Sequence, residues 1–264
     1  MTIIRSAKQD GYRKIVGPDN GTLHLLTFGM LTLQPQTHYE GVTQGEEKVL
    51  TLLKGRARVE VGGHVFEGER EGVFAGRATA FYLPAGASFS VVNVGDTELQ
   101  MAFCGTPSEE VFEPFMVKPD EVWARKVGKD NWQREVHDIV VKNAEGRVHR
   151  IIVGETFNAS GMWSSFPPHK HDDYIRGVEA EMEEVYYYQL NPESGFGLQA
   201  QYTTDGSVNQ AFRVLHGDTF LIDKGYHPVC AAGGYELYYL WMMAGPQDRV
   251  MIPHDDPAHA WVKQ

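Results

Sequence analysis

The sequence contains little cysteine and no long apolar run. Its two cysteines, Cys104 and Cys230, are too few for a disulfide framework and lack CxxC spacing. No stretch reaches the roughly 18 apolar residues that a membrane span needs. The N-terminus becomes polar within five residues, so it does not resemble a secretory signal. These absences predict a cytoplasmic protein with no membrane segment.

Positive charge is scarce as well. The 264 residues include 24 Lys and Arg against 35 Asp and Glu, which gives a net charge of −11. This balance argues against a nucleic-acid partner, because phosphate binding needs a basic surface. An anionic small molecule would have to be held by local cations or a metal ion, since the overall field repels it. The chain has neither a GxGxxG motif after a strand nor a P-loop, so no organic cofactor is predicted.

Most of the chain consists of short apolar segments separated by Gly, Pro, Asn and Asp. Examples are 50–55 and 81–86 in the first half, and 184–190 and 218–225 in the second. Short strands at spacings of about ten residues are typical of antiparallel sandwiches and barrels. Both halves place a strand–turn–strand before a Gly-containing turn, which indicates an internal duplication of a small barrel. We therefore predict an all-β fold with two barrels.

One stretch, residues 118–139, is predicted to be helical. It opens with Pro-Asp-Glu at 119–121, and Pro followed by acidic residues favours a helix N-terminus. Gly128 is expected to end this helix. The segment would be a short helical connector between an N-terminal barrel, 1–118, and a second barrel within 119–264.

Three histidines and a glutamate in the second half form a candidate metal site. His169 and His171 are two residues apart, and alternate residues of a strand point to the same face. Glu184 begins the segment EVYYYQL, and His227 follows a glycine turn at the start of another strand. Three imidazoles and one carboxylate suit zinc, manganese, iron or nickel and leave room for substrate oxygens. The alternative is that His169 and His171 are surface histidines in the polar turn PPHKHDD.

The first half of the chain lacks a comparable ligand set. Glu47 stands where the second half has its glutamate, but no His-x-His precedes it. Phe89 stands near the position of the last histidine, and His38 and His64 are isolated. We expect the N-terminal barrel to bind no metal ion and to serve packing or oligomerisation.

The order His-x-His, Glu, Gly-rich turn and His resembles the metal signature of cupins. Here 12 residues, 172–183, separate His171 from Glu184, which indicates a loop inserted in the hairpin. With this loop, the sequence resembles the 5-deoxy-glucuronate isomerase family of myo-inositol catabolism, most densely over 159–245. The segments that carry the resemblance are SGMWSSFPPHKHD (160–172), EEVYYYQLNPESGFGLQAQYT (183–203) and GYHPVCAAGGYELYYLWMMAG (225–245).

The choice between Glu183 and Glu184 as the ligand follows from the same motif. Motif matching places the ligand directly before Val-Tyr, which selects Glu184. Strand alternation then places Glu183 on the opposite face.

The resemblance implies a bicupin, with two double-stranded β-helix (jelly-roll) barrels in one chain. It implies a metal-dependent aldose–ketose isomerase that converts 5-deoxy-D-glucuronate to 5-dehydro-2-deoxy-D-gluconate. The ligands of its one divalent ion, zinc or manganese, would be His169, His171, Glu184 and His227. Its partner would be a small-molecule sugar acid, and a monomer or a homodimer is compatible with the sequence.

Three other functions are compatible with the same ligands. The related 5-dehydro-4-deoxy-D-glucuronate isomerases of pectin degradation share the ligand pattern but not the long loop. A cupin dioxygenase would hold iron in the same site, and a non-catalytic sugar-acid-binding cupin would bind without turnover. The loop and the aromatic segments favour the 5-deoxy-glucuronate isomerase.

Proton transfer and substrate binding need further side chains. Tyr186 and Tyr188 share the strand face of Glu184, so their hydroxyls are candidates for proton transfer, although an aromatic barrel core would also use them. Gln199 and Gln201 share a face and are candidates for binding sugar hydroxyls. The cationic candidates for the substrate carboxylate are Lys170, Arg176, Arg213 and Lys224.

Overall fold

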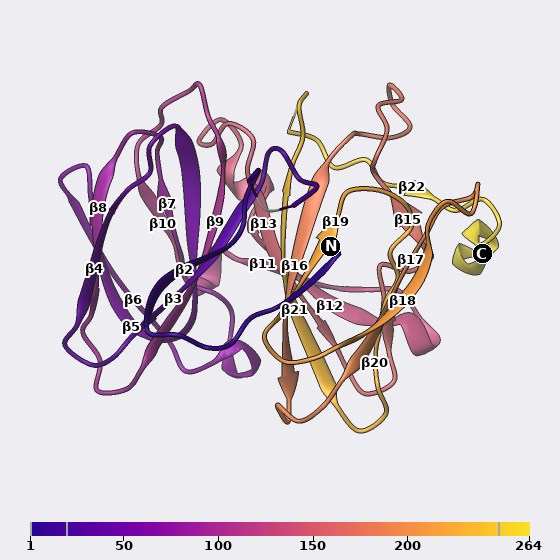
Figure 1. Cartoon of the computed structure of the whole chain (residues 1–264), viewed down its shortest axis with the longest axis horizontal. Helices are drawn as coiled ribbons and strands as arrows, with labels where there is room; N and C mark the ends of the chain where they lie inside the picture. Colours follow the sequence, from indigo (N-terminus) through magenta and orange to yellow (C-terminus); the bar gives the residue numbers. More distant parts are fainter. Residues whose placement is uncertain (1, 20, 248) are drawn as a thin grey trace. The chain divides into compact units, whose positions relative to one another are not determined.

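The structure, a computed structural model, describes every residue except 1, 20 and 248 (Figure 1). Within this part of the chain, every regular element is a β-strand or a 3-10 turn of at most four residues. The all-β fold predicted from the sequence is confirmed. No helix among the described residues is long and apolar enough to cross a bilayer.

The chain divides into two compact units. The N-terminal unit comprises Ala7–Trp123 and His137–Gly154, and the C-terminal unit comprises Met1–Ser6, Ala124–Val136 and Glu155–Gln264. The sequence predicted a single boundary after residue 118. In the structure, the first six residues belong to the C-terminal unit, and 137–154 belongs to the N-terminal unit.

A nine-stranded sheet forms the N-terminal unit. Its strands are β2 (Gly11–Val16), β3 (Thr27–Leu33), β4 (His38–Val42), β5 (Glu46–Val61), β6 (His64–Arg70), β7 (Ala80–Leu83), β8 (Ser88–Asn93), β9 (Leu99–Pro107) and β10 (Phe115–Val117). The 3-10 turns are η1 (Val73–Ala75), η2 (Pro119–Glu121) and η4 (Lys142–Ala144). The strand order is β10-β7-β5-β9-β3-β2, with β6 and β8 also paired to β5, and β4 paired to β8.

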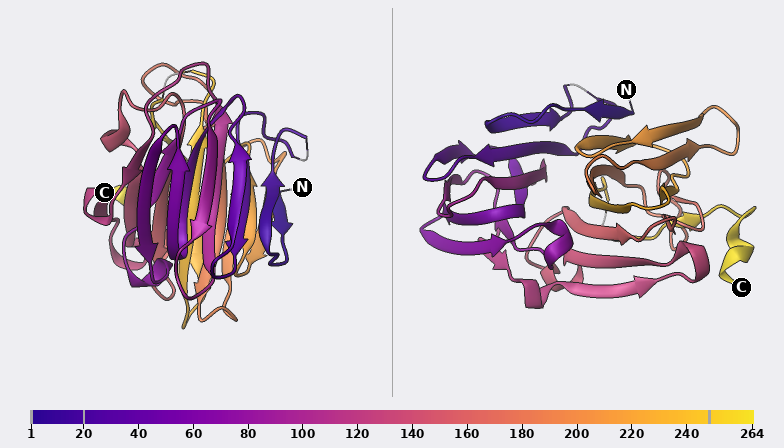
Figure 2. Two further views of the ribbon diagram at one scale, coloured as in Figure 1. Left: turned by 90° about the vertical axis from the view of Figure 1, so that its left-hand side faces the viewer. Right: turned by 90° about the horizontal axis from the view of Figure 1, so that it is seen from below.

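Strand β5 changes partners part-way along its length. Its first part pairs with β7 and β9, and its second part pairs with β6 and β8. The change occurs at Gly55, whose φ of +97° favours glycine, just after a register shift between Leu52 and Lys54. A Cβ at this position would lie 2.9 Å from backbone atoms of Glu98 and Leu99. The sheet curls from this bend around a buried apolar core (Figure 2).

The C-terminal unit is built mainly from the later strands. The remaining strands of the chain are β1 (Ile3–Arg5), β11 (Trp123–Val127), β12 (Arg134–Val140), β13 (Ile152–Asn158), β14 (Trp163–Ser164), β15 (His169–Lys170), β16 (Glu183–Asn191), β17 (Gly197–Tyr202), β18 (Asn209–Val214), β19 (Asp218–Ile222), β20 (Val229–Ala231), β21 (Glu236–Ala244) and β22 (His254–Asp255). The turns η3 (Asp130–Trp132) and η5 (Ala260–Lys263) complete them. A seven-stranded sheet has the order β1-β19-β16-β21-β13-β12-β11, a four-stranded sheet the order β14-β20-β17-β18, and β15 pairs with β22.

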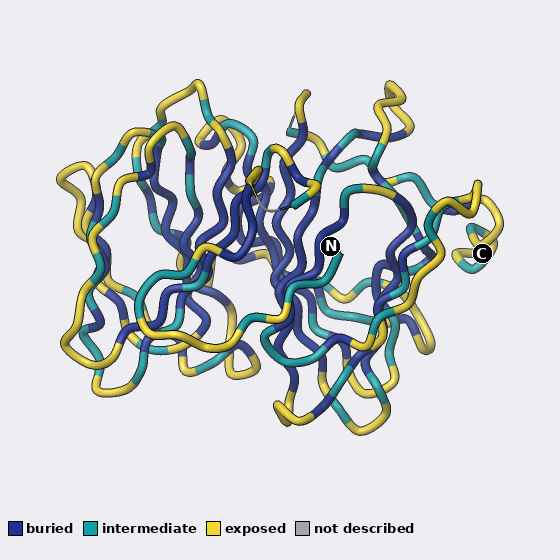
Figure 3. The backbone as a smooth tube through the Cα atoms, viewed as in Figure 1, coloured by how far each residue is buried: buried dark blue, intermediate teal, exposed yellow. Residues whose placement is uncertain are grey.

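The neighbouring strands β16 and β21 each carry three aromatic residues. Both are buried along nearly their whole length and appear dark blue in Figure 3. They contain the continuous apolar and aromatic runs VYYY (185–188) and LYYLWMMA (237–244), which are typical of strands buried on both faces. The register places Tyr186 opposite Trp241 and Glu184 opposite Met243. Glu184 is the one buried charged residue of these two strands, because Glu183 is half-buried and Glu236 is exposed.

The predicted helical connector is wrong. Residues 118–139 form η2, β11, η3 and β12. The Pro-Asp-Glu opening does start a turn, in which the Lys118 amide donates to Glu121 Oε2 at 2.8 Å, but the turn ends at once. Gly128, with a φ of +89°, follows a strand, and a Cβ there would lie 2.2 Å from the Trp132 carbonyl oxygen. Sheet pairing outweighs local helix signals here, because Val136, Ile139 and Val140 are buried within strand β12.

Candidate metal centre

His171, Glu184 and His227 converge in the interior of the C-terminal unit. The Nε2 atoms of His171 and His227 lie 3.0 Å and 3.4 Å from Glu184 Oε2. One ligand atom from each residue lies within 4.8 Å of the other two, and all three side chains are buried. Among the described residues this is the one group of His, Cys, Asp and Glu side chains with such spacing.

The local backbone aims each imidazole at the cluster. The His171 Nδ1 donates to the Met182 carbonyl at 2.8 Å, and the Met182 amide donates back to the His171 carbonyl at 2.8 Å. This pair closes the loop that was predicted between His171 and Glu184. The His227 Nδ1 donates to the Gly225 carbonyl at 3.0 Å. Because both Nδ1 atoms are occupied by backbone oxygens, both Nε2 atoms face Glu184.

A tight turn places His227. Gly225 has a φ of +79°, and a Cβ on it would lie 2.5 Å from the Tyr202 carbonyl oxygen, so glycine is required there. The side chain of Gln199 then fixes the backbone beyond the turn, because its Nε2 donates to the His227 carbonyl at 2.7 Å. Tyr188 in turn donates its hydroxyl to Gln199 Oε1 at 2.6 Å.

His169 lies beside the cluster. Its ring centroid is 4.9 Å from that of His227 and 6.4 Å from that of His171. The three-residue group defined by ligand-atom spacing does not include it. The structure thus brings three of the four predicted ligands together and places the fourth against one of them.

The electrostatic setting keeps two of the histidines neutral. Burial, together with the neighbouring imidazoles, lowers the pKa of His227 to about 3 and the pKa of His169 to about 3. Burial also disfavours the charged form of His171, but the hydrogen bond and charge of Glu184 raise its pKa overall. Neutral imidazoles carry the lone pair that a metal ion needs.

The donor set fits a divalent metal ion. His227 Nε2 is buried and has no hydrogen-bond partner among the described residues. An unpartnered buried nitrogen is costly in a folded protein unless it serves another purpose. Buried imidazoles with one carboxylate, each imidazole oriented by a backbone carbonyl, are the kind of site that holds zinc or a similar ion.

The cluster opens into a cavity of about 300 Å³ in the same unit. His169, His171 and Glu184 line it directly. Its other polar lining residues are Arg125, Arg134, Thr156, Ser165, Tyr186 and Tyr239, and its apolar ones are Val127, Val136, Met182, Trp241, Met243, Met251, Ile252 and Pro253. The cavity is large enough for a small organic molecule beside the cluster.

The two predicted tyrosines have different surroundings. Tyr186 lines the cavity, and its hydroxyl forms a 2.9 Å hydrogen bond with Ser165 Oγ. Burial raises its pKa well above the usual value, so the hydroxyl is protonated at neutral pH. Tyr188 does not line this cavity; it is fully buried and is held by Gln199. Of the two, only Tyr186 meets the space beside the cluster.

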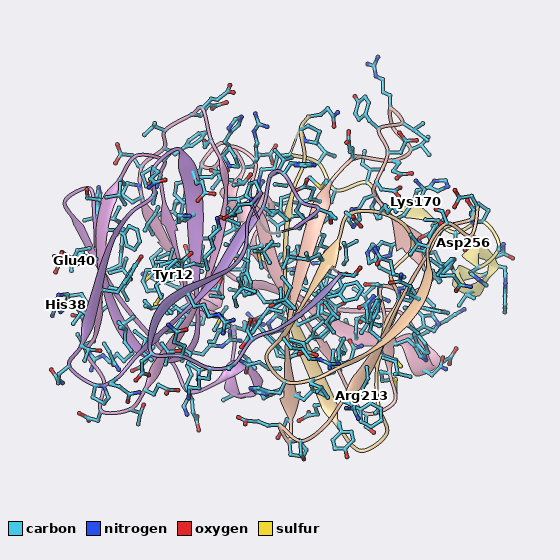
Figure 4. The ribbon with its side chains drawn as sticks, viewed as in Figure 1. Tyr12, His38, Glu40, Lys170, Arg213 and Asp256 are labelled. Atoms are coloured by element: carbon cyan, nitrogen blue, oxygen red, sulfur yellow. The ribbon has the colours of Figure 1, made fainter. Side chains whose placement is uncertain are left out.

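The predicted substrate-binding residues lie elsewhere. Lys170 pairs with Asp172 and Glu179, and Arg176 lines a separate, smaller cavity. Arg213 is exposed on β18, well away from Lys170 in Figure 4. The buried amides Gln199 and Gln201 donate to backbone carbonyls, Gln201 to that of Lys224 at 2.8 Å. None of the five lines the cavity beside the cluster.

Sequence reasoning missed Arg125, Arg134 and Ser165. The two arginines lie on β11 and β12, within the segment that was predicted to be helical. With a strand period of two, Arg125 shares a face with Val127, and Arg134 shares a face with Val136. All four residues line the cavity. The period-two pattern of these two strands was therefore the sequence signal that could have identified the two arginines.

Glu47 of the N-terminal unit has a different role from Glu184. It is fully buried and accepts four hydrogen bonds, from the Tyr82 hydroxyl and from the backbone amides of His149, Arg150 and Ile151, at 2.6–2.9 Å. Those donors satisfy both carboxylate oxygens. The side chain therefore anchors the 149–151 segment within its own unit.

Comparison with known proteins places the chain in a family. Residues 3–262 match the KduI/IolB family. The chain belongs to the KduI/IolB family. A relative named 5-deoxy-glucuronate isomerase from Halalkalibacterium halodurans is 35% identical over 250 residues, which cover 94% of this chain and 91% of the relative. A relative of the same name from Bacillus subtilis is 32% identical over 250 residues, with 94% and 91% covered.

Solved structures show that this member of the KduI/IolB family has a cupin-type β fold. An IolB-like protein from Salmonella typhimurium has a TM-score of 0.93 and 30% identity, with 100% of both chains covered. An oxalate decarboxylase from Lactobacillus farciminis has a TM-score of 0.66 and 12% identity, with 97% of this chain and 88% of that chain covered. The second likeness shows the fold alone.

Proposed function

We propose that the chain is a metal-dependent aldose–ketose isomerase that converts 5-deoxy-D-glucuronate to 5-dehydro-2-deoxy-D-gluconate. The observation that carries this proposal is the cluster of His171, Glu184 and His227, of which His171 and Glu184 line a cavity of about 300 Å³. It occurs in a chain that matches relatives named 5-deoxy-glucuronate isomerase over nearly its whole length. The substrate is thus a small sugar acid.

The metal-holding residues of the proposal are His169, His171, Glu184 and His227. His227 contributes its unpartnered Nε2, and His169 completes the set from its place beside His227. A bound divalent ion, zinc or manganese, would polarise the substrate carbonyl and stabilise the negative charge that develops when the neighbouring carbon loses its proton.

Tyr186 is the residue best placed to move a proton. Its hydroxyl is protonated at neutral pH, lines the cavity, and is oriented by Ser165 Oγ at 2.9 Å. A neutral hydroxyl of this kind donates a hydrogen bond, and then a proton, to an oxygen that becomes anionic. Tyr188 has an indirect role in positioning His227. Its hydroxyl donates a hydrogen bond to Gln199, and Gln199 donates one to the His227 backbone carbonyl.

The apolar side of the cavity suits a deoxy sugar acid. Met182, Met243, Met251 and Ile252 line it, and their side chains offer no hydrogen-bonding groups comparable to a hydroxyl. A substrate that has a methylene group at carbon 5 buries that group against such a wall without leaving a polar group unpaired.

Proton NMR with two candidate substrates tests the proposed reaction. The metal-loaded protein is incubated separately with 5-deoxy-D-glucuronate and with 5-dehydro-4-deoxy-D-glucuronate, the substrate of the pectin-degrading isomerases. We expect the ketose signals to grow with the first substrate and at least roughly a hundredfold more slowly with the second. The reverse preference would reassign the substrate, and no turnover of either by folded, metal-loaded protein would refute the isomerase.

A further inference from the structure

Two arginines on adjacent strands face the metal cavity. Arg125 lies on β11 and Arg134 on β12, and both line the cavity together with His169, His171 and Glu184. A guanidinium in such a wall is either a structural group that is neutralised by the protein or a binding group for an anion. The contacts of Arg134 decide between the two.

Arg134 is held firmly without being neutralised. Its Nη1 donates to the carbonyl oxygens of Phe166 at 3.1 Å and Trp132 at 3.3 Å, and its guanidinium carbon lies 5.8 Å from the centre of the Trp132 ring. Both acceptors are uncharged, and both bonds use the same nitrogen. No carboxylate among the described residues forms an ion pair with Arg134, although the chain has 35 Asp and Glu.

The guanidinium of Arg134 is also partly withdrawn from water. Burial lowers its pKa below the usual value, and the nearby charge of Arg125 acts in the same direction. An arginine stays protonated even so, so a positive charge without a partner remains in the cavity wall. Such a charge is costly, and an anion bound in the cavity would offset the cost.

None of the four cationic residues predicted from the sequence lines this cavity. Lys170 is also paired with Asp172 and Glu179, and Arg213 is exposed. Arg134 is also close enough to the cluster for its charge to contribute to the lowered pKa of His169. A molecule in the cavity can therefore meet the cluster and the guanidinium at the same time.

We propose that Arg134, with Arg125 beside it, binds the carboxylate of the sugar acid and so fixes which end of the substrate meets the metal cluster. The inference rests on the proposed isomerase function for the identity of the acid. The free Nη2 and Nε edge of Arg134 can take a carboxylate with two parallel hydrogen bonds. The aldehyde end of the same molecule then lies toward His171 and Glu184.

Binding of a substrate analogue that cannot react tests this role apart from turnover. Borohydride reduction of 5-deoxy-D-glucuronate gives a hydroxy acid that keeps the carboxylate but has no carbonyl to isomerise. Calorimetric titration is carried out on wild type, Arg134→Met, Arg134→Lys and the surface control Arg58→Gln, whose side chain pairs with Glu67. We expect Arg134→Met to weaken binding roughly 10- to 100-fold, Arg134→Lys to weaken it less, and the control to bind as wild type does.

Kinetics with a neutral analogue supply the second measurement. In 5-deoxy-D-glucose the carboxylate is replaced by a hydroxymethyl group. Wild type should prefer the acid in kcat/KM, and Arg134→Met should lose most of that preference through the KM for the acid. A purely structural role for Arg134 would affect both sugars alike. Metal content, measured in each variant, should stay at the wild-type level.

Several results would overturn the proposal. Analogue affinity within twofold of wild type in Arg134→Met would do so, as would a large loss in Arg213→Gln instead. If Arg134→Met does not fold, the wild-type protein still tests the proposal. Equal affinity of wild type for the reduced acid and for 5-deoxy-D-glucose would then refute the carboxylate site. Arg134-dependent binding of the reduced acid without any isomerisation would refute the isomerase and leave the carboxylate site standing.

Discussion

His227 Nε2 lies 3.4 Å from Glu184 Oε2 and has no hydrogen-bond partner among the described residues. The opposite nitrogen of the same ring donates to the Gly225 carbonyl, so the ring cannot turn to satisfy itself without losing that bond. A buried lone pair held toward a carboxylate is explained by a cation between them.

Removal of a cluster imidazole should remove the metal ion. We expect His171→Ala and His227→Ala each to lower the metal content of the purified protein to a small fraction of one ion per chain and to abolish isomerisation, because the remaining ligands cannot hold the ion alone. Inductively coupled plasma mass spectrometry measures the metal content, and circular dichroism checks the fold. His38→Ala, an exposed histidine in the N-terminal unit, is the matched control. Full activity in either cluster variant would refute the site.

Gln199 should act on the metal through His227. Gln199→Met keeps the volume but leaves the His227 carbonyl and the Tyr188 hydroxyl without partners. We expect the free energy of unfolding to fall by about 1–3 kcal/mol, and metal affinity to fall roughly 10- to 100-fold. Competition with a chelator measures the affinity. Tyr188→Phe removes only the hydroxyl that donates to Gln199, so it should lower metal affinity less than Gln199→Met does. A larger loss in Tyr188→Phe would contradict the proposed role of Gln199 in positioning His227.

Tyr186 should contribute to turnover and not to metal binding. We expect Tyr186→Phe to lower kcat roughly 100-fold while metal content stays at the wild-type level, because the hydroxyl lies in the cavity and its partner is Ser165. Ser165→Ala should lower kcat less, since it only orients the hydroxyl. Steady-state kinetics separates kcat from KM. An unchanged kcat in Tyr186→Phe would remove Tyr186 from the reaction.

The stability of the metal-free protein should fall as the pH is lowered. The pKa values of His169 and His227 are lowered to about 3 in the folded state, below the value of about 6.5 in an unfolded chain, so the unfolded state binds more protons. Their stabilising contribution is complete above about pH 6.5 and is lost progressively toward about pH 3. The raised pKa of His171 acts in the opposite direction and offsets part of the loss.

Chemical denaturation at pH 7 and pH 5 measures this effect in metal-stripped protein. Each of the two histidines should reduce the free energy of unfolding by about 2 kcal/mol over this interval. The variant His227→Asn should therefore lose about 2 kcal/mol less than wild type between the two pH values. An equal loss in the two proteins would show that His227 is not held neutral by burial.

The convergence of His171, Glu184 and His227 could be predicted from the sequence because the signals are local. Strand alternation related His169 to His171, although β15 ends at Lys170 in the structure. The glycine turn expected before His227 is present at Gly225. The placement of Arg125 and Arg134 could not be predicted in the same way. The Pro-Asp-Glu opening favoured a helix, and only pairing with distant strands makes this segment extended.

Other parts of the site depend on contacts that are distant along the chain. Gln199 and Gln201 share a strand face, as predicted, but that face meets backbone carbonyls of 224 and 227 and not the cavity. Lys170 follows His169 directly, yet Glu179 and Asp172 neutralise it. Sequence periodicity predicts to which face of a strand a side chain points. It does not predict which residues, distant in the sequence, pack against that face.

Stepwise restoration of the metal ion tests whether isomerisation depends on the proposed site. Metal-stripped protein is titrated with zinc or manganese, and the conversion of 5-deoxy-D-glucuronate to the ketose is followed by proton NMR at each addition. We expect no conversion without metal, and a rate that rises in proportion to added ion and stops rising at one ion per chain. Equal conversion by the stripped protein, or by His227→Ala protein supplied with the same metal, would refute the metal-dependent site.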